Sequence, residues 1–127
     1  MSYSIKNLRD VEDSAPKFGL SETQEARFAN QDLSAEDTGL SYLVVRPDRR
    51  LAFGHRHEKA EEIYVVLSGS GRMKLDDEII EIGPMDAIRV APQMARSFEG
   101  GAEGLEILAF GARHEGDGET LPDFWPN

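Results

Sequence analysis

Between Gly39 and Phe110 the sequence is a series of short apolar segments, rich in β-branched and aromatic residues, that are interrupted by Gly, Pro, Asp and Ser. Segments of this length and composition are typical of strands, and the interruptions are typical of turns. A helical period is almost absent from this region. The pattern therefore predicts an antiparallel β-sandwich or barrel.

Eight of these segments are the expected strands. Asp76-Asp77 stands between two of them and favours a hairpin with polar turn residues, whereas Ser68-Gly69-Ser70-Gly71 is expected to end a strand with a turn. The expected strands cover residues 40–46, 51–57, 62–67, 72–75, 78–82, 86–90, 95–99 and 105–110.

The N-terminal part of the chain is less regular. Ser21 with Gln24 three residues later resembles a helix capping box, but Asn30, Asp32 and Ser34 follow soon after. We therefore expect a short strand over residues 26–29, with one helical turn as the alternative. A chain of 127 residues fits one domain with its own core. We expect an arm with a first short element over residues 1–35, a barrel over 36–112, and a tail over 113–127 that packs on the barrel or on a partner subunit.

The charge balance limits the partners of this protein. Twenty-four acidic and 14 basic residues give a net charge of −10, which argues against nucleic acid and anionic membranes because both are polyanions. There is no cysteine, so disulfides and thiolate sites are excluded. The first residues lack the apolar run of a secretion signal, and we expect a cytoplasmic protein.

Two of the three histidines lie one residue apart, at His55 and His57. On a strand, side chains at i and i+2 share a face, so both imidazoles can converge on one point and Glu62 can join them from the next strand. Two imidazoles and one carboxylate form a plausible metal site. The same alternation directs Arg56 away from the histidines and Glu61 to the outer face.

These residues also carry a family resemblance. The stretch from Phe53 to Gly69 resembles the first motif of the cupin family, because His55, His57, Glu62 and Gly69 stand at its His-x-His, Glu and Gly positions. Residues 86–100 are similar to the second motif, in which an Asp, a Pro-x-Gly turn and a His follow one another. The resemblance implies an all-β fold, an antiparallel jelly-roll (cupin) barrel, here with an N-terminal arm.

The second motif departs from the family pattern at the residue that concerns a metal most. In cupins that keep all four ligands, three imidazoles and one carboxylate hold a divalent metal such as iron, manganese, nickel or zinc. Arg96 stands at the position of the third histidine, and a guanidinium has no lone pair to donate. The resemblance therefore implies at most three ligands, namely His55, His57 and Glu62.

Two arrangements of this site stay open. In the first, the two histidines and Glu62 leave coordination positions free, as in non-haem Fe(II) and catalytic zinc sites, and Arg96 holds a substrate carboxylate or phosphate. In the second, Arg96 forms an ion pair with Glu62, and its charge disfavours a bound cation.

The predicted ligand-binding residues are Arg96, Tyr64, Met73 and Phe98, of which the last three are otherwise plain core. We interpret the chain as a barrel that binds a small organic ligand, including an anionic one, with or without a divalent metal. A metal-dependent oxygenase or isomerase is one alternative, and a metal-free structural or sensing dimer is another. His114 is expected to be a solvated loop histidine.

A homodimer is also expected. In the segment 62–67 both alternating sets of side chains are apolar, whereas a sheet with one solvated face alternates apolar with polar residues. Covering by residues 1–35 is the intramolecular alternative, and a second copy of the chain is the favoured one.

Overall fold

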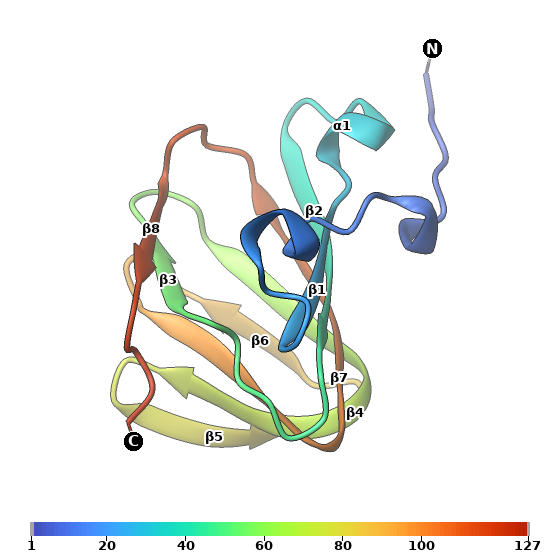
Figure 1. Ribbon diagram of the computed structural model, residues 1–127. Coiled ribbons are helices and arrows are strands. Elements are labelled where there is room, and N and C mark those ends of the chain that lie inside the picture. Colours follow the sequence, from blue (N-terminus) through green and yellow to red (C-terminus); the bar gives the residue numbers. More distant parts are fainter. Residues whose placement is uncertain (1, 127) are drawn as a thin grey trace.

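The computed structural model describes residues 2–126 and consists mainly of strands, with a few short helical segments (Figure 1). Within these residues the strands pair antiparallel and curl into a jelly-roll barrel, so the expected all-β fold is confirmed. The elements are η1 (Leu8–Asp10), η2 (Ala15–Phe18), β1 (Gln24–Phe28), α1 (Asn30–Leu33), β2 (Thr38–Val45), β3 (Gly54–His57), β4 (Glu62–Leu75), β5 (Glu78–Ile82), β6 (Ala87–Val90), β7 (Arg96–Ala112) and β8 (Gly118–Leu121).

Two long strands hold the barrel together. β4 pairs with β7 along most of its length and also with β5 and β6. β7 in turn lies between β2 and β3 in the strand order β1-β2-β7-β3-β8. The hairpin between β4 and β5 turns at Asp76-Asp77, as expected from the sequence. The favoured alternative for the N-terminal element is confirmed in β1, and the single helical turn α1 follows it, beyond the capping-box residues Ser21 and Gln24.

The expectation that residues 68–71 end a strand is wrong, because β4 continues through them with two shifts of register. Gly69 adopts a φ of +80°, and a Cβ there would lie 2.0 Å from the carbonyl oxygen of Gly104. A Cβ at Gly71 would lie 2.1 Å from the carbonyl oxygen of Glu99. These glycines therefore serve a close approach of β4 and β7 and a bulge, rather than a reversal of the chain. The strands expected over residues 95–99 and 105–110 are also one strand, because β7 runs without interruption from Arg96 to Ala112.

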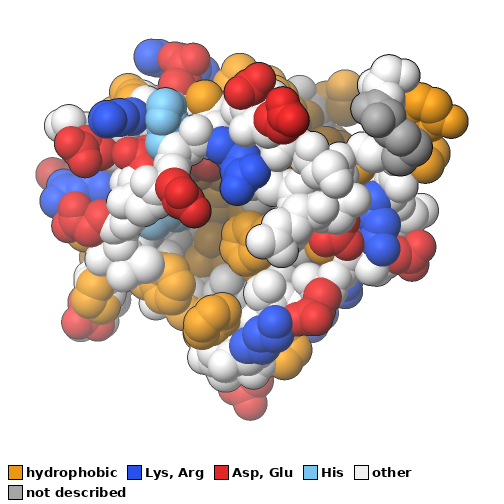
Figure 2. Space-filling model, turned by 90° about the horizontal axis from the view of Figure 1, so that it is seen from above, with side chains coloured by type: hydrophobic (Ala, Val, Ile, Leu, Met, Phe, Trp, Pro, Cys, Tyr) orange, Lys and Arg blue, Asp and Glu red, His pale blue; other side chains and the backbone are white. Residues whose placement is uncertain are grey.

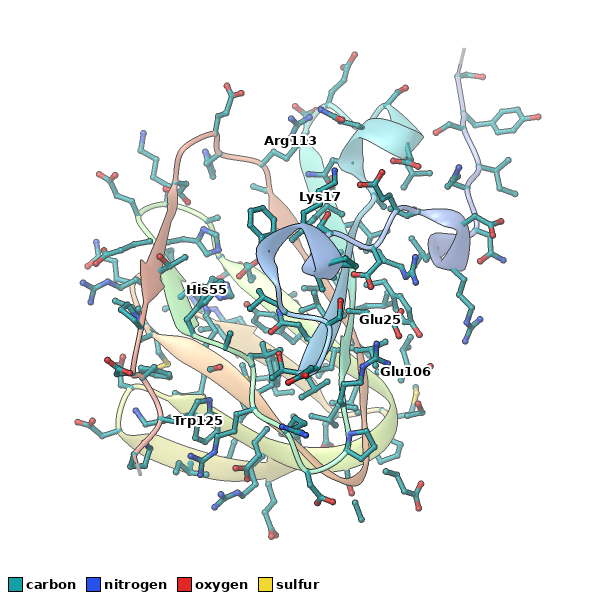
Figure 3. All side chains as sticks on the ribbon, in the orientation of Figure 1. Lys17, Glu25, His55, Glu106, Arg113 and Trp125 are labelled. Atoms are coloured by element: carbon teal, nitrogen blue, oxygen red, sulfur yellow. The ribbon has the colours of Figure 1, made fainter. Side chains whose placement is uncertain are left out.

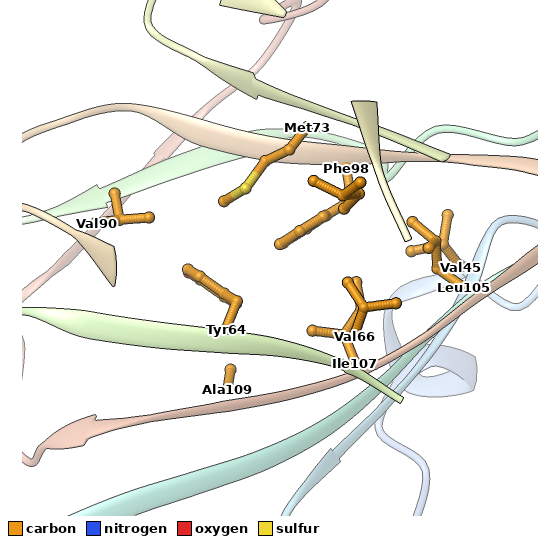
Figure 4. Packing of buried hydrophobic residues seen from close by; sticks show 10 residues of the cluster. Val45, Tyr64, Val66, Met73, Val90, Phe98, Leu105, Ile107 and Ala109 are labelled. Carbon is orange, nitrogen blue, oxygen red and sulfur yellow. The ribbon is translucent and has the colours of Figure 1, made fainter. Parts of the chain in front are cut away.

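The core lies between the strands in the interior of the barrel (Figure 4). Inward-facing residues of the central strands interlock there, and the Tyr64 and Phe98 rings meet edge to face at 5.1 Å. Met73 and Phe98 are 0% and 1% exposed. Both belong to this core, and their predicted contact with a ligand stays a prediction. The core residues are Val45, Tyr64, Val66, Met73, Ile82, Val90, Phe98, Leu105, Ile107 and Ala109.

The N-terminal arm packs along β1. The Asp13 carboxylate accepts backbone N–H bonds from Ala15 and Ala26, both at 2.9 Å, and the Ser14 N–H donates to the Ala26 carbonyl at 2.8 Å. Val11 is buried at the same junction. The arm therefore supplies an extra layer at the open end of the barrel, where η2 stands above β1 (Figure 1).

The C-terminal tail contacts the barrel as well, and it contains a strand that the sequence did not predict. β8 pairs with β3, and Gly54 is required there because a Cβ would lie 2.6 Å from the Phe124 ring. The Trp125 indole N–H donates to the Ser97 hydroxyl at 3.1 Å, and the Lys74 ammonium lies 3.7 Å from the Phe124 ring centre. The domain boundaries at residues 36 and 112 stay predictions.

The outer face of β4 is partly open. Ile63 and Val65 are half-buried and Leu67 is 41% exposed, whereas Tyr64 and Val66 on the inner face are buried. The homodimer inferred from this apolar face stays a prediction. No helix within residues 2–126 is long and apolar enough to cross a bilayer.

Candidate metal and ligand site

The structure brings His55, which is labelled in Figure 3, together with His57 and Glu62 at one point. The alternation of β3 places both imidazoles on the inner face, and Glu62 is the first residue of β4. The Nε2 atoms of His55 and His57 lie 3.3 and 3.1 Å from Glu62 Oε1. One donor atom from each of the three residues lies within 4.8 Å of the others.

These distances fit a shared metal ion. Nitrogen and oxygen ligands bind divalent metals at about 2.0–2.2 Å, so neighbouring ligand atoms of one ion stand about 3.0–3.5 Å apart. The two nitrogen-to-oxygen distances fall in that range. The buried ring nitrogens of His57 have no hydrogen-bond partner among residues 2–126. Buried polar atoms without a partner are costly, and a metal ion would satisfy Nε2.

Tyr64 supports the carboxylate from the barrel interior. Its hydroxyl donates to Glu62 Oε1 at 2.6 Å and lies 3.3 Å from His55 Nε2. Burial works against ionisation of Glu62, but hydrogen bonds from His55 and Tyr64 outweigh it and lower the Glu62 pKa to about 2. Burial and the Glu62 charge raise the Tyr64 pKa well above its usual range. Glu62 is therefore a carboxylate and Tyr64 a neutral phenol near neutral pH.

Arg96 lies beside Glu62, but its hydrogen bonds go to the backbone. Its side chain is 0% exposed, and its two Nη atoms donate to the carbonyl oxygens of Pro92 and Ala91 at 3.2 Å. Nη2 lies 4.0 Å from Glu62 Oε1, at the limit of an ion pair. The guanidinium is thus fixed beside the carboxylate by the backbone of the β6–β7 turn. Its role in ligand binding stays a prediction.

Asp117, in the tail, is a site residue that the sequence did not reveal. Its Oδ2 lies 3.5 Å from His57 Nδ1, and its carboxylate accepts backbone N–H bonds from Lys59 and Ala60 at 2.9 Å. Burial opposes the charge, but these backbone bonds lower the Asp117 pKa. The sequence offers no local signal for this contact, because Asp117 reaches the β3–β4 turn from about sixty residues away.

We expect Asp117→Ala to accelerate amide hydrogen exchange at Lys59 and Ala60 by about tenfold or more, because both N–H groups lose their acceptor. The His57 N–H donates to the Pro92 carbonyl at 2.8 Å and serves as the internal control, with unchanged exchange. If NMR shows that all three amides of Asp117→Ala exchange at the rates of the natural protein, the Asp117 carboxylate does not protect Lys59 and Ala60.

A cavity of about 820 Å³ lies above these groups, and His55, His57, Glu62 and Tyr64 are part of its wall. Seen from above, the molecule has a hollow with hydrophobic side chains in its floor and charged side chains at its rim (Figure 2). Several of the residues from β1, β2 and β7 that line the hollow are small and leave space there. These small lining residues are Ala26, Gly39, Ser41, Ala109 and Gly111.

The other candidate residues from the sequence are not part of the group formed by His55, His57 and Glu62. His114 is exposed on the loop before β8 and lines only the rim of the cavity. Arg56 points outward and forms two hydrogen bonds with Glu119, both at 3.1 Å. Glu61 is exposed and pairs with Arg89 at 2.6 Å.

Known proteins resemble this chain in fold over its whole length but in sequence only over part of it. No protein-family profile matches the chain. Over 55 residues it is 40% identical to the uncharacterized protein MJ1618 of Methanocaldococcus jannaschii, a match that covers 42% of this chain and 44% of that protein. The chain thus matches less than half the length of this relative.

Solved structures cover the chain far more completely. A cupin protein of Bacteroides fragilis aligns over 100% of this chain and 98% of its own, with a TM-score of 0.73 and 21% identity. A uridine-bound structure of the Streptomyces nucleoside dehydratase Pac13 aligns over 96% and 93%, with a TM-score of 0.75 and 18% identity. The chain therefore has a cupin-type barrel, as the sequence motifs implied. At these identities the likeness defines the fold and not the activity.

Proposed function

We propose that this protein binds a divalent metal through His55, His57 and Glu62 and uses it to hold a small organic ligand in the cavity above. The observation that carries the proposal is the pair of distances, 3.1 and 3.3 Å, from the two imidazole nitrogens to one carboxylate oxygen. Two imidazoles and a carboxylate suit Fe(II), and they also suit zinc, manganese or nickel.

The chemistry of the site would be divided between the metal and the chain. A bound metal supplies Lewis-acid polarisation of an oxygen of the ligand, and iron would add one-electron chemistry. Tyr64 is a neutral phenol at the floor of the site and can hold a proton at its Oη. Arg96 adds a positive charge beside Glu62, which favours an anionic ligand. A metal-dependent oxygenase or isomerase is the enzyme form of this proposal, and Pac13, a nucleoside dehydratase, is an enzyme of the same fold.

A metal-free ligand-binding or structural role is the second candidate, and one observation favours it. Glu62 already accepts a hydrogen bond from Tyr64 and lies 4.0 Å from the buried Arg96, so its negative charge is compensated without a metal ion. A metal would have to overcome the repulsion of that guanidinium.

Elemental analysis of tag-free protein reconstituted with Fe(II), Mn(II), Ni(II) or Zn(II) separates these candidates. We expect about one metal per chain in the natural protein. His57→Ala should retain little metal, because its metal affinity falls by at least about a hundredfold. His114→Ala removes the exposed histidine of the rim and is the matched control, with unchanged metal content. If the natural protein contains no metal after all four reconstitutions, the metal site is contradicted and the metal-free role is favoured.

A further inference from the structure

Three phenylalanines line the cavity while much of each ring is open to solvent. Phe18 is 72% exposed, Phe28 is 55% exposed and Phe53 is 37% exposed. They come from three separate segments, namely η2, β1 and the residues before β3. Large aromatic side chains are normally buried, so a gathering of exposed rings around one hollow indicates a binding surface.

The register of the strands explains why these rings stand open. Along β1, Ala26 and Phe28 face the cavity, whereas Glu25 and Arg27 face outward and form an ion pair at 2.8 Å. Phe28 is paired with Ser41 on β2, which is too small to cover the ring. The fold therefore directs Phe28 into open space.

The part of the cavity beside His55, His57 and Glu62 is polar, and it is cationic once a metal is bound. Glu62 and Asp117 contribute two negative charges there, while a divalent ion and the buried Arg96 contribute three positive ones. An anionic group is the complement of that balance. A volume of about 820 Å³ lies within the range of ordinary small-molecule pockets, about 300–1,000 Å³.

We propose that the ligand is a planar aromatic carboxylate, bound with its ring system among Phe18, Phe28 and Phe53 and its carboxylate at the metal. This inference rests on the proposed function for the carboxylate end and on the three exposed rings for the aromatic end. Aromatic pairs gain energy from stacked and edge-to-face contacts beyond the area that they bury. A flat ring therefore suits this wall better than a flexible chain of equal area.

Calorimetric titration of the zinc-loaded protein with 2-naphthoate tests the inference. We expect one binding site per chain, and an affinity about five- to thirtyfold weaker in Phe18→Ala and in Phe28→Ala, because each loses aromatic contact. Ile79→Ala is the matched control, because Ile79 is 37% exposed on β5 and is outside the cavity wall. Octanoate and neutral 2-naphthamide should each bind at least about tenfold more weakly than 2-naphthoate.

Each result decides one part of the inference. A dissociation constant above about 1 mM for 2-naphthoate, or affinities unchanged in both phenylalanine variants, overturns it. Equal binding of octanoate overturns the aromatic end, and equal binding of 2-naphthamide overturns the carboxylate end. The zinc content of the same samples separates the two proposals. Zinc without naphthoate binding overturns this inference alone. Naphthoate bound through the phenylalanines without zinc overturns the metal site and the carboxylate end that rests on it, and leaves the aromatic end.

Discussion

The Arg96→His protein is expected to bind Zn(II) at least about a hundredfold more tightly than the natural protein. Arg96 Nη2 lies 4.0 Å from Glu62 Oε1, so an ion bonded to that oxygen stands within about 6 Å of the guanidinium. At this distance, with an effective dielectric constant of about 20, each unit of charge on the ion costs about 3 kcal/mol in repulsion. The change removes that repulsion and adds an imidazole at the position where cupins with four ligands have their third histidine.

Arg96→Met separates the two contributions, because it removes the charge without adding a ligand. We expect its zinc affinity to lie between those of the natural protein and Arg96→His, as measured by competition with a chromogenic chelator. Equal affinities in all three proteins would mean that the metal does not sit at Glu62. Because Arg96 is buried, circular dichroism of each variant is required to establish that the barrel remains folded.

Acid is expected to remove about 3 kcal/mol of stability from the metal-free protein through Glu62 alone. The Glu62 pKa is about 2 in the folded protein, against an ordinary value of 4.5, and its side chain is only 18% exposed. A carboxyl group whose pKa is lowered by folding stabilises the fold fully above its ordinary pKa. That stabilisation is lost as the pH falls through the folded pKa, so the window runs from about pH 5 to about pH 2.

Glu62→Gln provides the comparison, because an amide keeps the shape of the side chain and does not titrate. Urea unfolding with a chelator present would measure the stability difference between the natural protein and Glu62→Gln at several pH values. We expect this difference to fall by about 3 kcal/mol from pH 5 to pH 2. A difference that is constant with pH would contradict the hydrogen bonding of the Glu62 carboxylate by His55 and Tyr64.

Local patterns were sufficient for most of the barrel. Alternation and turn residues located the strands and the hairpin at Asp76-Asp77, and they placed His55 and His57 on one face towards Glu62. They failed at the glycines of β4, because a glycine required for close contact with β7 resembles a glycine required for a turn. The distinction depends on which strand lies opposite.

The remaining features depend on contacts between distant parts of the chain. β8 is short, polar and largely exposed, so its composition did not mark it as a strand, and it forms by pairing with β3. Asp117 approaches His57 only because of that pairing. The burial of Arg96 could not be read from its own segment, because the carbonyls of Ala91 and Pro92 that hold it belong to the turn before β7. Phe18 lines the cavity only because the arm packs along β1.

Anomalous diffraction from crystals of the zinc-reconstituted protein tests the metal site most directly. The predicted result is one strong peak per chain, at about 2.0–2.2 Å from His55 Nε2, His57 Nε2 and a carboxylate oxygen of Glu62. The absence of a peak between these residues, with the Glu62 carboxylate still bonded to the Tyr64 hydroxyl, would contradict it, as would a single peak at His114.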